Sequence, residues 1–438
     1  MATAPQFESM SRVQAMFRSL RHRNFQLFFS GQLISLIGTW MDNIAEAWLV
    51  YRLTGSSLLL GAVAFAGQIP VFLMAPIGGM AADRLDRHKI VIATQASSMI
   101  LAFTLAGLTL SGRVKVWEVV VLASLMGIVN AFDIPARQAF LVEMVGREDL
   151  MNAIALNSSM FNGARVIGPS IAGIIVAGVG EGWCFFANAV SYIAVITGLL
   201  LMRLGPRRRV TIDTSPFEHI AEGFRFVSRA RPIRALLLLI GLVSFVAVPY
   251  SVLMPIFADR ILHGGALGLG LLMGAAGVGA LLGALTLTLR SGVQGLGRWV
   301  GWAAMGFGAS LVLFSCSRMF WLSFALLIPV GYGVMLQMAC CNTLIQSMVP
   351  DHLRGRALAA YTMMFMGMAP LGMLFAGAAA EHVGAPWTVG LGGTAAVIGG
   401  FVFLRSLPNL RFEARELLVA TQGVAGESGE QAPAERMP

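Results

Sequence analysis

Long apolar segments, separated by short polar stretches, recur along the whole chain. Each is about 20 residues long, which is enough to cross ~30 Å of hydrocarbon as a helix. The apolar runs are continuous and do not alternate at every second residue, so the pattern excludes an outer-membrane barrel. It predicts an all-α membrane protein with twelve transmembrane helices, at about 25–50, 57–82, 90–111, 117–140, 155–179, 183–203, 234–258, 266–289, 298–316, 320–345, 357–380 and 386–405.

The distribution of basic residues favours this even number of spans. With the N-terminus in the cytosol, five of the 31 Lys and Arg residues fall in outer loops, Arg165 falls inside a span, and the remaining 25 lie on the inner side. Cytosolic loops of membrane proteins carry such an excess. The pattern therefore predicts a protein of the bacterial inner (plasma) membrane with both termini cytoplasmic. The five outer residues are Arg52, Arg113, Lys115, Arg260 and Arg318.

Composition narrows the class of protein further. Hydrophobic residues make up 57% of the chain and charged residues 12%, whereas soluble domains have about 45–50% and about a quarter. The net charge of +9 comes from loops between spans, without interleaved aromatic residues, so we expect no nucleic-acid partner.

The four cysteines lack metal-ligand spacing and are interpreted as small buried side chains. The chain has no nucleotide-binding Gly-x-x-x-x-Gly-Lys-Ser/Thr motif and no catalytic set. These absences predict a protein that is not an enzyme and needs no cofactor or metal.

The two halves of the chain resemble each other. Met144 corresponds to Met348, Gly163 to Gly367 and Gly173 to Gly377, each pair 204 positions apart. Two six-helix repeats predict two pseudo-symmetric bundles with a substrate path between them near mid-bilayer. The predicted units are a cytosolic lead 1–24, a first bundle 25–203, a basic linker 204–233 with an amphipathic helix, a second bundle 234–405 and a largely disordered cytosolic tail 406–438.

A dense cluster of charge lies between the second and third spans, from Pro76 to Lys89. Its Gly79, Asp83, Arg84 and Arg87 resemble the Gly-x-x-x-Asp-Arg-x-x-Arg-Arg loop motif of the major facilitator superfamily, with His88 in place of a second cation. The resemblance implies the major facilitator fold, two bundles of six helices. The alternative is a loop whose cations only fix the orientation of the neighbouring spans in the membrane. That role does not explain the carboxylate of Asp83.

The same resemblance implies a gate. In this family the loop motif and an Asp/Arg pair in the fourth span, here Asp133 and Arg137, form a charge network that stabilises the outward-open state. Breaking and re-forming such pairs changes the relative free energy of two packings, as alternating access requires. These residues are therefore expected to control opening without contacting the substrate.

The stretches Asp133-Ile-Pro-Ala-Arg-Gln-Ala-Phe and Asn152 to Gly173 resemble the drug and siderophore exporter branch of this superfamily. Within the second stretch, Gly163, Gly168, Pro169 and Gly173 are similar to its antiporter motif, with the spacing altered by one residue. Small residues allow close helix approach and proline bends a helix. Simple close packing is the alternative role for this motif.

Two carboxylates lie within the first predicted span. Asp42 and Glu46 are four positions apart and therefore share one helical face. Intramembrane carboxylates are costly and usually face a cavity or a partner, which suits a proton-coupling or cation-binding role. Arg165 in the fifth span is a further candidate for coupling or substrate contact. A structural pair between Arg165 and these carboxylates is the alternative.

Several polar residues within spans are candidates for lining a cavity for an amphipathic ligand, although ordinary interhelical hydrogen bonds and packing explain most of them. They are Gln32, Asn43, Gln68, Asn157, Asn162, Gln337 and Tyr361.

The residues and the resemblance together predict a monomeric secondary transporter that exports a small amphipathic compound, such as a drug, macrolide or siderophore, driven by protons. An uncoupled facilitator or lipid-moving transporter is one alternative. A membrane sensor or scaffold that does not transport is another, and the intact loop motif argues against it. The expected partners are a small-molecule substrate, protons and the lipid bilayer.

Overall fold

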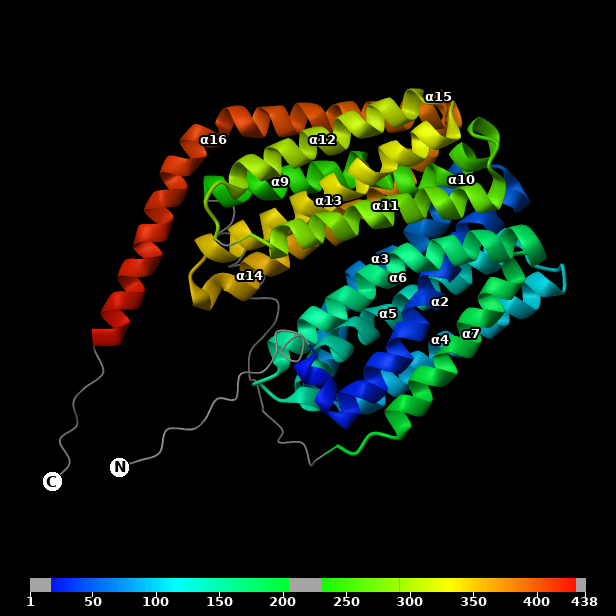
Figure 1. Cartoon of the computed structure of the whole chain (residues 1–438), viewed down its shortest axis with the longest axis horizontal. Helices are drawn as coiled ribbons and strands as arrows, with labels where there is room; N and C mark the ends of the chain where they lie inside the picture. Colours follow the sequence, from blue (N-terminus) through cyan, green and yellow to red (C-terminus); the bar gives the residue numbers. More distant parts are fainter. Residues whose placement is uncertain (1–16, 205–229, 291, 431–438) are drawn as a thin grey trace.

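The computed structural model describes residues 17–204, 230–290 and 292–430, and within these ranges the regular structure is helical (Figure 1). The first half contains the short 3-10 turn η1 (Arg18–Arg21) and then α2 (Arg23–Thr54), α3 (Ser57–Arg84), α4 (Arg87–Leu110), α5 (Val116–Val145), α6 (Leu150–Val179) and α7 (Glu181–Leu200). The second half contains α9 (Arg231–Val246), η2 (Val248–Leu253), α10 (Met254–Ile256), η3 (Phe257–Ile261), α11 (Gly265–Thr288), α12 (Leu296–Cys316), α13 (Phe320–Met348), α14 (Asp351–Thr362), η4 (Met363–Gly367), α15 (Met368–Val383) and α16 (Ala385–Glu430).

Among the described residues, eleven helical segments are long and apolar enough to cross a membrane. Two of them are broken helices: Arg231–Ile261 combines α9, η2, α10 and η3, and Leu353–Val383 combines most of α14 with η4 and α15. Helix α2 is the twelfth. Its 32 residues are more than long enough to span, and polar residues such as Asp42 and Glu46 lower its hydropathy. The predicted all-α, twelve-helix architecture is confirmed.

The helices form two groups that follow the two halves of the sequence. Figure 1 shows α2 to α7 in one group and α9 to α16 in the other. Two helix pairs, α6 with α11 and α3 with α15, make most of the contacts between the groups. The break between the two groups lies between Leu200, where α7 ends, and Arg231, where α9 begins.

The two contacts between the halves repeat the same geometry, and we call them the α6–α11 seam and the α3–α15 seam. A Cβ atom added at Gly173 on α6 would lie 3.1 Å from both the Ala266 carbonyl oxygen and Gly270 Cα on α11. At the corresponding Gly377 on α15, it would lie 2.6 Å from the Ser57 carbonyl oxygen and 3.0 Å from Gly61 Cα on α3. Because equivalent glycines make equivalent contacts, the internal sequence repeat is a structural repeat.

The halves are bonded to each other at the end of the molecule away from the termini. There, the Tyr51 hydroxyl donates to Asp259 at 2.7 Å, and Arg260 donates to the Gly55 carbonyl oxygen at 3.1 Å. Figure 1 shows the helices of the two halves diverging from this end toward the end at which N and C are marked. We call these ends the joined end and the terminal end.

A carboxylate of the second half adds to the contacts at the joined end. Glu381 on α15 accepts hydrogen bonds from the Ser57 hydroxyl at 2.8 Å and from the Leu58 amide at 3.2 Å, at the start of α3. An anion at a helix N-terminus satisfies amides that lack an intrahelical partner. Glu381 therefore caps a helix of the opposite half.

The structure differs from the prediction in the C-terminal tail, and it does not describe most of the linker or of the N-terminal lead. We expected residues 406–438 to be largely disordered, but α16 continues as a helix to Glu430, passing Pro408. Its segment 411–422 contains Ala, Leu, Glu and Arg, all strong helix formers, and these outweigh its polar composition. The predicted amphipathic helix of the linker and most of the N-terminal lead lie outside the described residues, as do 431–438.

Candidate functional site

Asp42 and Glu46 lie one turn apart on α2, on the face that packs against α7. Asn188 of α7 lies beside Asp42, and the Glu46 carboxylate is close enough to Asp42 to interact with it electrostatically. The buried Asp42 Oδ1 has no hydrogen-bond partner among the described residues. Neither carboxylate lies within 4 Å of a described Lys, Arg or His nitrogen. The two predicted coupling residues are therefore together, inside the first half.

Arg165 lies near the midpoint of α6, on the other side of α2 from the carboxylates. Its guanidinium is 5.6 Å from the centroid of the Trp40 ring. Trp40 and Asp42 are two positions apart, which places them about 200° apart around the helix. The structure therefore does not form the Arg165–carboxylate pair that we considered as an alternative.

Arg87 in the charged loop fastens the start of α4 to the terminal end of α5. Its guanidinium lies 3.7 Å from an Asp83 oxygen and 3.1 Å from Glu143 Oε1, and it donates to the Ala82 and Ala139 carbonyl oxygens at 2.9 and 3.2 Å. Arg84 is exposed. Of the network expected from the motif, the Arg87–Asp83 contact is formed, but Glu143, which the sequence did not suggest, is the carboxylate closest to Arg87.

Asp133 is a buried acceptor between α4 and α5. One oxygen accepts from Thr94 Oγ1 at 2.8 Å and from Gln95 Nε2 at 2.9 Å, and the other lies 3.2 Å from Arg137 Nε. The predicted Asp133–Arg137 pair is therefore formed, one helical turn apart. Thr94 and Gln95 were missed, because the sequence does not show which helices are neighbours.

Next to the charged loop motif, Gly78 is the glycine whose lack of a side chain allows α3 to pack closely against α5. A Cβ there would lie 2.0 Å from the Ala131 carbonyl oxygen, whereas one at Gly79 would meet nothing within 4 Å. A side chain at 78 would force α3 and α5 apart. The motif's own Gly79 has no such packing constraint in this conformation.

Asp149, just before α6, is the centre of a charge cluster that the sequence did not reveal. The nearly inaccessible carboxylate contacts Arg18, lies 2.9 Å from Arg21 Nη2 and lies 2.7 Å from His22 Nε2. The hydrogen bond with His22 lowers the pKa of Asp149 below its ordinary value of 3.8, and Arg18 and Arg21 lower it further, against the opposing effect of burial. The cluster fastens η1 to the start of α6.

The antiporter-like motif lies on the sides of α6 that pack against α2 and α11. A Cβ at Gly168 would lie 2.5 Å from Trp40 Cβ. The Pro169 carbonyl oxygen lies 2.4 Å from where a Cβ of Gly270 would be, and Gly173 meets the same stretch of α11. Gly163 has open space around it. Three of the four motif residues therefore allow close packing, and two of them do so at the seam between halves.

The polar candidates within spans lie in different surroundings. Gln32 is buried with its Oε1 unpaired, and Gln337 is buried with both polar atoms unpaired within the described structure. Gln68 reaches across the halves to the Met373 sulfur at 3.3 Å. Two other candidates bond to backbone: Asn162 donates to the Ser158 carbonyl oxygen at 2.9 Å, and Tyr361 donates to that of Met338 at 3.1 Å. Asn43 is exposed and Asn157 is half-buried.

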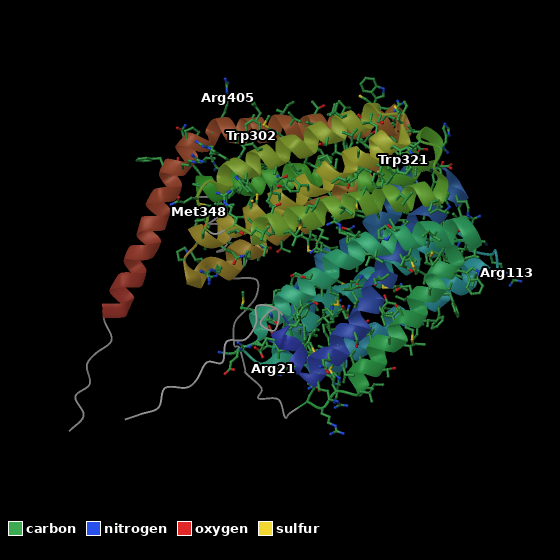
Figure 2. All side chains as sticks on the ribbon, viewed as in Figure 1. Arg21, Arg113, Trp302, Trp321, Met348 and Arg405 are labelled. Atoms are coloured by element: carbon green, nitrogen blue, oxygen red, sulfur yellow. The ribbon has the colours of Figure 1, made fainter. Side chains whose placement is uncertain are left out.

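A recess of about 340 Å³ lies between α12 and α13, away from the carboxylates. Trp302, one of its lining residues, lies on the outer edge of the second half, opposite the side that faces the first half (Figure 2). It is therefore a groove on the bundle exterior. Within the described ranges no group of three or more His, Cys, Asp or Glu is placed to hold a metal ion.

The two six-helix groups, the glycine seams that join them and the charged loop define a membrane transporter of the major facilitator superfamily. A sequence model of the family described as "Transmembrane secretion effector" matches residues 14–421. The chain belongs to this family, whose members are transporters and not enzymes.

Characterised relatives align over most of their length. The chain is 27% identical to a staphyloferrin A transporter of Staphylococcus aureus, over 86% of this chain and 94% of that protein. It is 28% identical to the multidrug efflux pump Tap of Mycolicibacterium fortuitum, over 79% and 87%. With the enterobactin exporter EntS of Salmonella choleraesuis it shares 27% identity, over 89% and 94%. These similarities confirm the predicted exporter branch.

Solved structures show the same fold at low sequence identity. The nucleoside transporter NupG superposes with a TM-score of 0.67 at 13% identity, over 89% of this chain and 99% of that one. A bacterial homologue of the iron transporter ferroportin, in an inward-facing state, superposes with a TM-score of 0.65 at 17% identity, over 87% and 98%. The major facilitator fold implied by the loop motif is confirmed.

Proposed function

We propose that this transporter exports a small amphipathic compound from the cytosol in exchange for protons, by alternating access between its two halves. The relatives named above include exporters of siderophores and drugs, which supports export of a compound of that kind. The terminal end, with its many basic residues, is then the cytosolic end. The joined end faces outward.

The observation that carries the proposal of proton coupling is the pair Asp42 and Glu46. The two carboxylates lie one turn apart within the membrane, and the ion pairs of the described residues supply no cation to either. Such a group is costly in the bilayer and usually marks an ion or proton site. Asn188 is a polar neighbour that can hydrogen-bond the Asp42 carboxyl group, so the site can accept or release a proton without losing all its polar contacts.

The contacts between the halves support alternating access. In this conformation the joined end is fastened by Tyr51, Arg260 and Glu381, which corresponds to a state open toward the cytosol. In the opposite state these contacts would break and the terminal ends would approach. The Arg87 and Asp133 networks lie at those terminal ends, where they can stabilise the second packing.

The test is transport by the purified full chain in liposomes, with and without an imposed pH gradient. The probes are three fluorescent amphipaths: cationic ethidium, neutral N-phenyl-1-naphthylamine and anionic 1-anilinonaphthalene-8-sulfonate. We expect at least one to be moved faster with the gradient. Asp42→Asn should remove this acceleration, and Glu148→Gln, an exposed carboxylate outside the membrane, should keep it. Movement that ignores the gradient and is unchanged in Asp42→Asn would refute proton coupling and favour an uncoupled facilitator.

A further inference from the structure

Arg165 is a cation within the membrane for which the described part of the chain supplies no anion. No described carboxylate lies within 4 Å of its guanidinium, which lies over the face of the Trp40 ring. An intramembrane arginine is costly unless it is paired or faces a polar cavity. A cation–π contact offsets only a small part of that cost. The arrangement therefore calls for a negative group from another source.

The position of Arg165 places that missing anion between the two halves. Its carbonyl oxygen lies 2.8 Å from where a Cβ of Gly277 on α11 would be, so this turn of α6 packs directly on the second half. Tyr250 of η2, also in the second half, is close enough to interact with it electrostatically. The guanidinium is thus at the meeting point of α2, α6, α11 and η2, near the midpoint of α6.

Aromatic rings surround the same point. Trp40 and Phe161 meet edge to face with ring centroids 5.6 Å apart, and Phe161 lies one turn from Arg165 toward the terminal end. Phe161 is 45% exposed although it belongs to a helix at the seam. A planar guanidinium recognises carboxylate or sulfonate oxygens in pairs, and aromatic rings bind flat apolar groups.

We infer that Arg165, Trp40 and Phe161 form a binding site for an amphipathic organic anion with an aromatic part, and that such anions are the transporter's preferred cargo. This inference rests on the proposed export function and adds the chemical class of the substrate. The cation and the proton-coupling carboxylates then lie on opposite faces of α2. The anion of the substrate pairs with Arg165, and Asp42 and Glu46 remain free to exchange protons.

The test compares two ligands that differ in one charged group. 1-Anilinonaphthalene-8-sulfonate and N-phenyl-1-naphthylamine share the anilinonaphthalene rings, but only the first carries a sulfonate. Binding to the purified full chain is measured by energy transfer from tryptophan. We expect the wild type to bind the sulfonate at least about ten-fold more tightly, the usual effect of one charge-assisted contact. Arg165→Gln should abolish this preference and keep the weaker binding of the neutral compound.

Two further variants separate charge recognition from a structural role. Arg165→Lys should restore part of the preference, because it keeps the charge and loses the planar fork. Arg113→Gln, which removes an exposed arginine at the joined end, should leave the preference unchanged. Thermal melting of each variant shows whether the fold is retained.

The outcomes distinguish this inference from the proposed function. Equal binding of the two compounds by the wild type, or an unchanged preference in a folded Arg165→Gln, would overturn the anion site. The proposed function would survive that result if ethidium were still moved by the pH gradient. Conversely, a preference that depends on Arg165, with no response of transport to the gradient, would support the anion site and refute proton coupling.

Discussion

At the scale of single residues, two charged groups at the terminal end, Asp149 and Arg87, each make several tertiary contacts. Asp149 collects Arg18, Arg21 and His22 from a segment about 130 positions away. Arg87 similarly joins two helices through Glu143 and two carbonyl oxygens. Because each charged group bonds to several partners at once, its removal breaks several tertiary contacts together.

We predict that Asp149→Asn lowers the free energy of unfolding by about 1–3 kcal/mol at pH 7, because Arg18 and Arg21 lose their shared anion and the His22 ring loses a charged hydrogen-bond partner. Since the folded-state pKa of Asp149 is lowered, its contribution is complete above the ordinary value of 3.8 and is lost as the pH falls through the lowered folded-state value. The measurement is thermal melting of wild type and variant in detergent at neutral pH and at about pH 3.

Asp86→Asn is the matched control, because Asp86 caps α4 by accepting from the His88 and Lys89 amides. Asparagine caps helices as well as aspartate, so this variant should melt close to the wild type at both pH values. A melting difference for Asp149→Asn that persists undiminished in acid would contradict the assigned role of its charge.

The sequence predicted some of these residues and missed others for one physical reason. Asp42 and Glu46 share a helical face, and Asp133 and Arg137 are one turn apart; helical periodicity alone places such neighbours. The same periodicity puts Trp40 and Asp42 on opposite faces of α2. Had it been known that Trp40 faces α6, this alone would have argued against an Arg165–Asp42 pair. Glu143, Thr94 and the Asp149 cluster depend on which helices pack together, and one sequence does not carry that information.

At the scale of elements, the molecule depends on glycines where helices of opposite halves meet. On α11, Gly270, Gly274 and Gly277 face α6 in successive turns, and Gly61 and Gly377 meet at the other seam. Without a hydrophobic driving force between helices in lipid, such close backbone approach is a main source of association. Length and apolarity predicted the spans well, but not which glycines form the seams or that α16 continues to Glu430.

We predict that Gly270→Ala weakens the α6–α11 seam and lowers the transport rate several-fold. The new Cβ would lie 2.4 Å from the Pro169 carbonyl oxygen, and overpacking of this kind costs about 1–3 kcal/mol. Gly163 belongs to the antiporter-like motif of α6, which Gly270 packs against at Pro169 and Gly173. A Cβ at Gly163 meets nothing within 4 Å, so Gly163→Ala should keep the rate and gain slightly in helix stability. Transport in liposomes and melting in detergent measure both effects. If the two variants behave alike, close packing at the seam is not what the motif provides.

At the scale of the whole molecule, the conformation seen here is held by a small number of bonds across the joined end. Glu381 caps α3 of the other half, and Tyr51 and Arg260 link the end of α2 to η3. The joined-end carboxylate Glu181 bonds to Arg52 within the first half only. The two glutamates are thus chemically alike, but only Glu381 should respond to how the halves are arranged.

Glu381→Gln should therefore shift the population toward the state that is open at the joined end, and Glu181→Gln should not. Hydrogen bonds to a charged acceptor are stronger than those to a neutral amide, so losing the carboxylate should measurably increase the population of the state that is open at the joined end. Spin labels at Arg113→Cys and Met319→Cys, one in each half at the joined end, report the distance by double electron–electron resonance. The exposed Cys316 is replaced by serine in this background, since the other three cysteines are buried. A longer distance in both glutamate variants, or in neither, would show that the Glu381 cap on α3 does not hold the two halves together. Of the two glutamates, only Glu381 makes a contact between the halves, so only its variant should lengthen the distance.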